Sequence, residues 1–597
     1  MRTVSGTVTE SSVESHPTTH TSELHPAAGD SQAMSDWSVV YHGWRPQEEG
    51  TREALCTLGN GYFATRGAAE ESTADDVHYP GTYLAGGYDR AKSEVKNRVI
   101  ENEDLVNWPN WLPLTFRIEG GQWFSLSNVT VLDYRQELAL DKGMLTRTLR
   151  VEDRDGHVTS LRSRRFVHIS QPHRAAIHWE LIPHNWSGPV TLRSSLDGNI
   201  ENEGVERYRA LNGDHIDVLD TGKTQSGILY LRARSHQSRI EMALACRNRI
   251  LLNGEVVRSE VLPRYSDNAI GIEVSLPVHE GETVEVEKTV AIYTSRDFAI
   301  TQPLQEAVDS AHASPHFEDL ARTHVQTWSR IWHRCDLDTD GLGEQTQLIL
   351  RLHIFHLMQV ATKNILDLDV GVPSRGLHGE AYRGHILWDE LFILPYLNFR
   401  IPELSREFLM YRYRRLDRAR DAAWRAGYDG AMFPWQSGSN GREESQALHL
   451  NPASGHWVPD ETHLQRHVNA AIAYNVWQYF QATRDIDFIH FFGAELMLEI
   501  ARFWASVAHY EPKRRRYEIH GVVGPDEYHT RYPGARNAGL RNNAYTNVMV
   551  AWVMRRTLDV LDLLSAARRK ELMQKLELTS DEIQRWREMA ESMYVPI

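Results

Sequence analysis

The chain has 597 residues, which is too many for one ordinary hydrophobic core, so we expect two or more domains. Hydrophobic residues make up 41% and charged residues 24%, the balance of a water-soluble globular protein. The net charge of −15 argues against a nucleic-acid partner, because a phosphate backbone requires a basic surface. No apolar run approaches the ~18 residues of a membrane helix, so we expect no membrane partner either.

Residues 1–36 are rich in Ser, Thr, His and Glu and lack the apolar core of a signal peptide. This composition predicts a disordered tail. The three cysteines, Cys56, Cys246 and Cys335, are far apart and match neither a disulfide framework nor a zinc spacing. We therefore expect buried free thiols and a cytoplasmic protein.

Residues 37–298 show mostly the period of two that is typical of strands. The side chains Ile240, Met242, Leu244 and Cys246 alternate with other residues, which places them on one face of a strand. The pair Asp155-Gly156 between two such runs indicates a tight hairpin turn. Without regularly spaced helices, this region predicts an antiparallel β-sandwich domain.

Residues 299–343 predict a helical linker, and residues 344–597 a domain in which helices follow one another without strong strands. Three sets of apolar side chains recur at helical spacing. They are Leu348, Leu352 and Phe355, then Ile472, Val476 and Phe480, then Leu496, Ile500, Phe503 and Val507. Thr579 and Glu582 predict a capping box at the start of another helix.

The basic run 411–415 is the strongest charge cluster in the helical region. We interpret it as the solvated face of a helix rather than as an anion site. The apolar side chains expected to point inward are Phe408, Leu409, Leu416 and Ala419.

Three loops in the helical region mix glycine, aromatic and ionisable residues, at 376–390, 432–438 and 524–529. One end of a helical barrel could bring them together. Cleavage of a glycosidic bond needs a protonated carboxyl group, and Glu527 beside Asp526 fits that role. Trp388 followed by Asp389 combines an aromatic wall for a sugar ring with an acceptor for its hydroxyl groups.

Each of these features has a plainer interpretation. The Gly-Pro-Asp-Glu segment that ends at Glu527 could be a turn with an Asp helix cap, and Trp388 could be a core residue. His378 and His385 could supply half of a metal site, but no third ligand stands at a recognisable spacing, so we expect no metal. By themselves, the three loops suggest a carbohydrate site and nothing more specific.

The segment 379–389, which ends in Trp388-Asp389, and the segment 524–529 together resemble glycoside hydrolase family 65. That family contains maltose, trehalose, kojibiose and nigerose phosphorylases and a few hydrolases such as acid trehalase. The resemblance extends from about residue 37 to the last residue. Further segments that agree are Leu58–Tyr62, Thr65–Gly67, Asn107–Leu112, Ser195–Gly198 and Asn543–Asn547.

The resemblance implies a β-sandwich, a helical linker and an (α/α)6 barrel. It also implies an inverting reaction in which Glu527 is the proton donor, while Trp388 and Asp389 hold the non-reducing glucose in the −1 subsite. In the phosphorylases, inorganic phosphate attacks the anomeric carbon from the opposite face and yields β-D-glucose 1-phosphate and a free sugar. No cofactor is needed, the partner is an α-glucosyl disaccharide, and a homodimer is suggested.

In the family, a glucose-binding Lys-Gln pair and a phosphate-binding Ser/Thr/His loop follow the proton donor. Nothing between Glu527 and Ile597 resembles either, so we expect a chain truncated at its C-terminus, an incomplete barrel and an inactive fragment. The leading hypothesis is a disaccharide phosphorylase. The alternatives are an inverting α-glucoside hydrolase, similar to acid trehalase or a kojibiose hydrolase, and a carbohydrate-binding protein without turnover.

Overall fold

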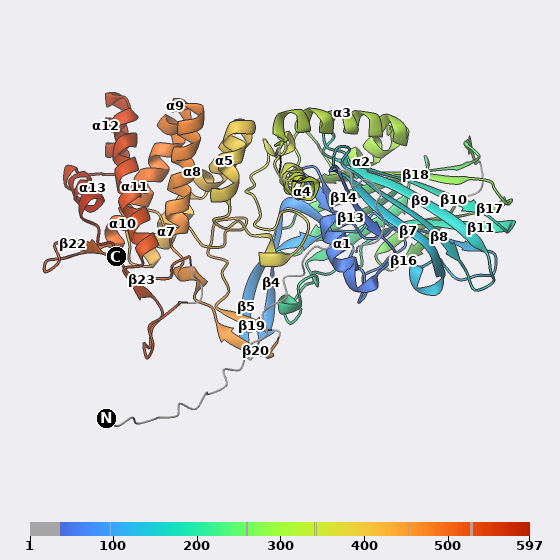
Figure 1. The fold of residues 1–597 in the computed structure, drawn as a ribbon, viewed down its shortest axis with the longest axis horizontal. Coiled ribbons are helices and arrows are strands. Elements are labelled where there is room, and N and C mark those ends of the chain that lie inside the picture. Colours follow the sequence, from blue (N-terminus) through green and yellow to red (C-terminus); the bar gives the residue numbers. More distant parts are fainter. Residues whose placement is uncertain are drawn as a thin grey trace, which may run out of the picture.

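The computed structural model describes residues 36–95, 97–257, 261–339, 341, 343–451, 453–525 and 529–596. The predicted disordered tail therefore lies, apart from Asp36, outside the described residues. A β-rich half is followed by a helical half, and the two lie side by side along the longest axis (Figure 1).

Strands dominate the first half, as its period of two predicts. They are β1 (Ser38–His42), β2 (Leu58–Gly59), β3 (Phe63–Thr65), β4 (Thr82–Val95), β5 (Arg98–Asn107), β6 (Leu114–Ile118), β7 (Thr130–Ala139), β8 (Met144–Glu152), β9 (Val158–Val167), β10 (Arg174–Pro183), β11 (Gly188–Asp197), β12 (Ile216–Lys223), β13 (Leu229–Ser235), β14 (Glu241–Leu252), β15 (Glu255–Val256), β16 (Leu262–Ser266), β17 (Ala269–Val278) and β18 (Val284–Thr294). A short helix that the pattern did not predict, α1 (Glu49–Leu55), interrupts them.

The strands form a 10-stranded sheet in the order β1-β7-β8-β9-β10-β18-β14-β13-β12, with β15 beside β14. Two 4-stranded sheets accompany it, in the orders β16-β17-β11-β6 and β2-β3-β4-β5. Neighbours within these sheets pair antiparallel, which confirms the antiparallel arrangement expected from the sequence. The hairpin between β8 and β9 turns at Asp155-Gly156 as predicted, with Gly156 at φ 83°.

Both faces of the central strand β14 are buried. Met242 and Leu244 lie on one face in the main core, as their alternation predicts. The residue between them, Ala243, belongs to a separate cluster that includes Ala307 and Ala311 of helix α2 (Pro303–His312). Small side chains on this second face allow α2 to pack closely against the sheet. The three cysteines are free and buried, as predicted.

The second half consists mainly of helices. They are α3 (Phe317–Cys335), α4 (Glu344–Val360), α5 (Glu390–Arg400), α6 (Pro402–Arg414), α7 (Leu416–Arg425), α8 (Val468–Thr483), α9 (Ile486–Phe488), α10 (Ala494–Val507), α11 (Ala544–Leu563), α12 (Ala566–Lys575) and α13 (Ser580–Ser592). Short strands lie between them: β19 (Leu448–Asn451), β20 (His456–Pro459), β21 (His509–Glu511), β22 (Arg516–Glu518), β23 (His520–Val522) and β24 (Leu540–Arg541). Among the helices that the structure describes, none has the length and hydropathy needed to cross a bilayer.

Two of the predicted helix faces are confirmed. The apolar sets on α8 and α10 are buried, apart from the half-buried Val507 at the end of α10. The capping box is present at the start of α13, where the Thr579 side chain accepts from the Glu582 backbone and the Glu582 side chain accepts in return.

The buried face of α4 differs from the prediction. Leu348 and Leu352 are only half-buried, whereas Arg351 is buried. The Arg351 guanidinium pairs with Asp336 at 2.8 Å and lies 3.8 Å from the ring centre of Trp37. The ion pair and the aromatic ring compensate for the hydration that the Arg351 charge loses on burial. A pattern of apolar residues cannot predict a buried position that is occupied by a charged residue.

The interpretation of the basic run as a solvated face is wrong for two of its arginines. Arg412 and Arg415 are buried, and only Arg414 is exposed. Each buried guanidinium has partners: Arg412 pairs with Glu390 at 2.9 Å, and Arg415 pairs with Asp369 at 3.0 Å. The predicted inward side chains on either side of the run, Phe408, Leu409, Leu416 and Ala419, are buried as expected.

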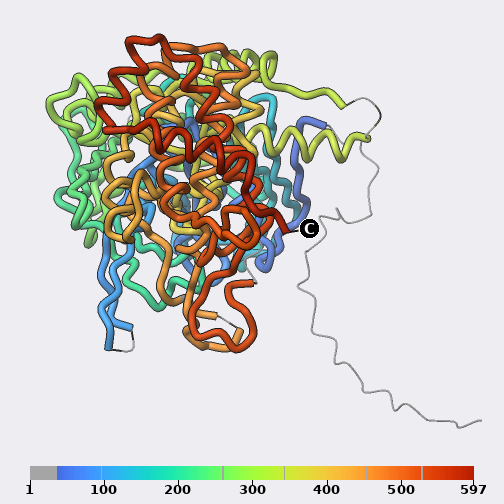
Figure 2. The backbone as a smooth tube through the Cα atoms, turned by 90° about the vertical axis from the view of Figure 1, so that its left-hand side faces the viewer, coloured from blue at the N-terminus to red at the C-terminus, as the bar shows by residue number. Residues whose placement is uncertain are grey.

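Three hairpin segments project to the same side of the molecule. The β4–β5 hairpin, the β19–β20 hairpin and the loop that leads to β24 all point downward in Figures 1 and 2, two views that differ by a rotation about the vertical axis. The β-rich half therefore extends two of its strands alongside loops of the helical half.

Trp328 on α3 packs between the helical half and the β-rich half. Its ring stacks on Phe355 of α4 at 4.8 Å and is fully buried. On the other side the ring lies so close to Gly143, directly before β8, that a side chain at Gly143 would overlap it. We expect Trp328→Ala to lower the free energy of unfolding by ~3–5 kcal/mol, because the cavity removes apolar contacts on all sides. Urea denaturation checks this, with the exposed neighbour Arg330→Ala as the control. Equal stability of the two variants would contradict the role of Trp328.

Candidate functional site

The first two loops singled out from the sequence lie together. Ile386 and Ser437 form an antiparallel bridge, with backbone hydrogen bonds of 2.9 and 3.0 Å in the two directions. Beside the bridge, His385 Nδ1 lies 3.1 Å from Gln436 Oε1. The expectation that these loops meet is therefore confirmed for 376–390 and 432–438.

Trp388 lies within a cluster of aromatic rings contributed by four segments. Its ring centre is 4.7 Å from that of His467, 5.9 Å from Trp435 and 6.2 Å from Tyr545. Burial lowers the pKa of His467 to about 4, against the opposing influence of the Val523 backbone, so its imidazole is neutral near pH 7. Trp388 itself is only half-buried. The cluster is therefore an uncharged aromatic surface on which the rings of Trp388 and Tyr545 remain partly accessible, which suits the apolar face of a sugar.

Asp389 is the N-cap residue of α5, but its side chain makes no capping hydrogen bond. The side chain is half-buried, and this burial raises the pKa of its carboxyl group, while a hydrogen bond to its own backbone and the charge of Arg375 act in the opposite direction. Since the carboxylate does not cap the first turn of α5, it can accept hydrogen bonds from a ligand.

One buried guanidinium fixes the residues on both sides of the Trp388-Asp389 pair. Arg412 donates from Nη2 to the Leu387 carbonyl at 2.7 Å, and from Nε and Nη2 to Glu390 Oε2 at 3.0 and 2.9 Å. Burial raises the pKa of the Glu390 carboxyl, and Arg412 opposes that shift. Because Leu387 and Glu390 flank the pair in sequence, Arg412 determines where Trp388 and Asp389 lie.

The third loop contains the predicted proton donor. Glu527, with Asp526 and Tyr528, lies outside the described residues. The segment before it is described: the Val523 N–H donates to the Leu464 carbonyl at 3.0 Å. Leu464 lies three residues before His467, so the loop that carries Glu527 begins near the aromatic cluster.

Sequence reasoning did not single out His467, because a lone histidine before a helix carries no distinctive spacing. Tyr545 and Trp435 lay within segments noted in the sequence, Asn543–Asn547 and 432–438, but without a role. Gln465 was also missed: its side chain is buried, and neither its amide nitrogen nor its oxygen has a hydrogen-bond partner among the described residues. Buried amides normally have hydrogen-bond partners, so the Gln465 side chain is a candidate for binding a polar group at this site.

The two histidines considered as half of a metal site lie in different surroundings. The His378 ring packs 5.3 Å from that of His356, whereas His385 contacts Gln436. Among the described residues, neither belongs to a group of three side chains close enough to share an ion.

The β4–β5 hairpin fixes the two loops from the side of the β-rich half. Asp104 pairs with Arg383 of the first loop at 2.6 Å. Glu103 accepts from the backbone N–H of Ser439, directly after the second loop, at 2.8 Å. A side chain at Gly438 would overlap the Glu103 carboxylate, so the glycine permits this close approach.

Comparison with known proteins identifies two family matches. Residues 39–331 match the N-terminal domain of glycosyl hydrolase family 65, and residues 351–597 match the central catalytic domain of that family. The chain is 44% identical over 560 residues to an uncharacterized glycosyl hydrolase of Mycobacterium tuberculosis, covering 94% of this chain and 42% of that protein. It is 35% identical over 525 residues to a trehalose 6-phosphate phosphorylase of Lactococcus lactis, covering 87% and 65%.

A kojibiose phosphorylase of Halothermothrix orenii is 32% identical over 563 residues, covering 91% of this chain and 68% of that protein. A solved structure assigned as a kojibiose phosphorylase from the human microbiome shares the fold, with a TM-score of 0.78 at 19% identity over 94% of this chain and 70% of that one. The chain spans less than half the length of the Mycobacterium tuberculosis relative and about two thirds of the length of the two phosphorylases. It belongs to glycosyl hydrolase family 65.

Substitution of Arg412 tests whether its buried ion pair with Glu390 stabilises the segment that carries Trp388 and Asp389. We expect Arg412→Met to lower the free energy of unfolding by ~3–5 kcal/mol, because it leaves the Glu390 carboxylate buried and unpaired. The control is Arg414→Met on the same helix, whose exposed ion pairs contribute only ~0–1 kcal/mol. Thermal unfolding followed by circular dichroism measures both, and equal losses would show that Arg412 has no special role.

Proposed function

We propose that the protein is an inverting disaccharide phosphorylase that cleaves an α-glucosidic bond with inorganic phosphate to give β-D-glucose 1-phosphate and a free sugar. The relatives named by activity support this, since they are phosphorylases of trehalose 6-phosphate and kojibiose. The observation that carries the proposal is the accessible ring of Trp388, followed by an uncapped carboxylate, among aromatic side chains. Phosphate is a co-substrate, and no cofactor is required.

Trp388 and Asp389 are proposed to hold the non-reducing glucose. The ring offers an apolar face to the sugar, and the carboxylate accepts charge-assisted hydrogen bonds from its hydroxyl groups. Gln465, two residues before His467, offers an amide without a partner among the described residues, suited to a further hydroxyl. Arg412 acts through Leu387 and Glu390 as a positioning residue.

Glu527 is proposed as the general acid that protonates the oxygen of the leaving sugar. Phosphate attacks the anomeric carbon from the opposite face, its oxygen forming the new bond as the glycosidic bond breaks. A single displacement inverts the configuration and requires no nucleophile from the protein. We further propose that the helical half is part of an (α/α)6 barrel, and that the enzyme acts in the cytoplasm, where its buried cysteines remain thiols.

The second candidate is an inverting α-glucoside hydrolase. The relative from Mycobacterium tuberculosis, which is 44% identical, is described as an uncharacterized glycosyl hydrolase, so its name keeps hydrolysis as the alternative. In a hydrolase, a carboxylate activates water where the phosphorylases bind phosphate. The two reactions are distinguished by their products and by their need for phosphate.

The phosphorolysis proposal is tested by assaying the protein on trehalose, maltose and kojibiose with and without phosphate. We expect β-D-glucose 1-phosphate only when phosphate is present. Glu527→Gln should lower the rate by ~10²–10⁴-fold, because the amide keeps the shape of the side chain but carries no acidic proton. Glu571→Gln, at an exposed position on α12, serves as the control. Release of free glucose without phosphate would favour the hydrolase, and an unchanged rate in Glu527→Gln would remove Glu527 from its role.

Asp389→Ala tests the glucose-binding role directly. Each hydrogen bond to a charged group contributes ~1.5–3 kcal/mol, so glucose affinity should fall at least ~10-fold. Calorimetric titration with the disaccharide measures this, with Asp417→Ala as a matched control because its side chain is 93% exposed. Unchanged affinity in Asp389→Ala would show that the −1 subsite lies elsewhere.

A further inference from the structure

Three side chains that could bind a metal lie together on a small sheet outside the candidate sugar site. His509 on β21 is the direct cross-strand partner of Glu518 on β22. His520, at the start of β23, follows Glu518 by two residues and so projects to the same face of an extended chain. The residue between them, Ile519, is fully buried. The strand register therefore brings the three polar side chains to one face.

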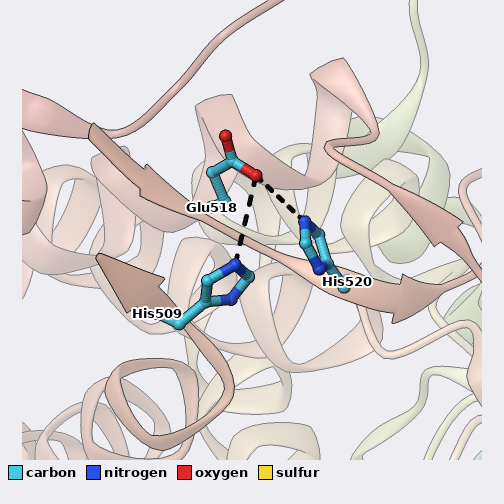
Figure 3. Close-up of side chains that lie close together, drawn as sticks. All are labelled: His509, Glu518 and His520. Atoms are coloured by element: carbon cyan, nitrogen blue, oxygen red, sulfur yellow. Dashed lines mark hydrogen bonds and ion pairs between the residues drawn. The ribbon is translucent and has the colours of Figure 1, made fainter. Parts of the chain in front are cut away.

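Two imidazole rings converge on one oxygen of the Glu518 carboxylate (Figure 3). Glu518 Oε2 lies 3.0 Å from His520 Nε2 and 4.0 Å from His509 Nε2, and the three potential ligand atoms lie within 4.8 Å of one another. A tetrahedral ion with bonds of ~2.0–2.1 Å holds its ligand atoms about 3.3 Å apart. The observed distances bracket that value, so small rotations of the partly exposed histidines would complete the geometry.

The other carboxylate oxygen is already occupied. Arg514 Nη1 donates to Glu518 Oε1 at 2.6 Å, and the Arg514 guanidinium lies 4.8 Å from the ring centre of Tyr594. The Glu518 side chain is only 7% exposed, compared with 47% for His509 and 35% for His520. The carboxylate is thus held in place with one oxygen directed at the histidines, as metal-binding carboxylates are oriented by outer hydrogen bonds.

A second cluster of three possible metal ligands, Asp153, Asp155 and His157, differs from the first in how its carboxylate is bonded. There, Asp153 Oδ1 accepts from the backbone N–H groups of Asp155 and His157, each at 2.9 Å, and Oδ2 lies 2.9 Å from His157 Nδ1. All three bonds of Asp153 stay within the turn between β8 and β9, and two of them come from backbone N–H groups, whereas the side chains around Glu518 come from β21, β23 and Arg514. This cluster is explained by its hairpin and needs no ion.

We propose that His509, Glu518 and His520 bind one divalent transition-metal ion of the zinc class, with water as the fourth ligand. Two imidazoles and one carboxylate are a ligand set that such ions favour, whereas magnesium and calcium prefer oxygen alone. The ion links the β21–β22 hairpin to the first residue of β23. Strand β23 ends at Val522, and the next residue, Val523, donates its backbone N–H to the Leu464 carbonyl just before the loop of Glu527. The ion therefore fixes the strand that leads into that loop.

The test uses the 597-residue chain, first freed of metal with a chelator. Titration with Co²⁺, followed by its visible absorption, and competition with Zn²⁺ should show one equivalent bound. His509→Ala and His520→Ala should each weaken binding at least ~10-fold, because even changes to outer partners of a metal site cost 10–100-fold. Zn²⁺ should raise the thermal unfolding midpoint of the original chain but of neither variant.

The control is His157→Ala, which removes a partly exposed histidine from the contrasting cluster and should leave the Co²⁺ titration unchanged. Glu518→Gln should also weaken binding, and circular dichroism verifies that each variant is folded. The proposal is overturned if His509→Ala and His520→Ala bind Co²⁺ as tightly as the original chain. It is equally overturned if His157→Ala abolishes the signal, since the ion would then be bound by the cluster of Asp153, Asp155 and His157.

Discussion

The arrangement of the candidate site depends on buried charges between the β4–β5 hairpin and the helical half. Arg90 on β4 pairs with Glu103 at 3.0 Å and with Glu444 of the helical half at 2.6 Å, and all three side chains are less than a tenth exposed. If any one of these side chains lost its partner, its charge would remain unpaired in a poorly hydrated interface, which is strongly unfavourable. The hairpin must therefore follow the loops of the helical half closely, and Glu103 extends the same contact to Ser439.

Within the helical half, a second buried charge plays a comparable part. Arg412 binds the Leu387 carbonyl and the Glu390 carboxylate, one on each side of Trp388-Asp389. The hairpin thus constrains the two loops from the β-rich side, and Arg412 constrains the first loop from α6. These contacts hold the irregular segment that carries the Trp388 ring and the Asp389 carboxylate, and selective binding of a small ligand requires such support.

The proposed catalytic and metal sites share one strand. His520 begins β23, and Val523, just beyond its end, bonds to Leu464 beside the aromatic cluster of Trp388 and His467. Strand β23 has 3 residues and pairs with β24, which has 2. A short strand gains little from its own ladder of hydrogen bonds, so contacts at its two ends largely determine its position.

The sequence by itself determined the order of strand-rich and helix-rich halves, the buried faces of α8 and α10, and the capping box of α13, because these depend on local periodicity and on residues a few positions apart. It also drew attention to Trp388 and Asp389. Only the tertiary structure decided that Arg351 and Arg412 are buried, since their partners Asp336 and Glu390 are identified by packing. The same holds for His467 beside Trp388 and for His509 opposite Glu518, because ring packing and strand register join residues whose spacing in the sequence carries no signal.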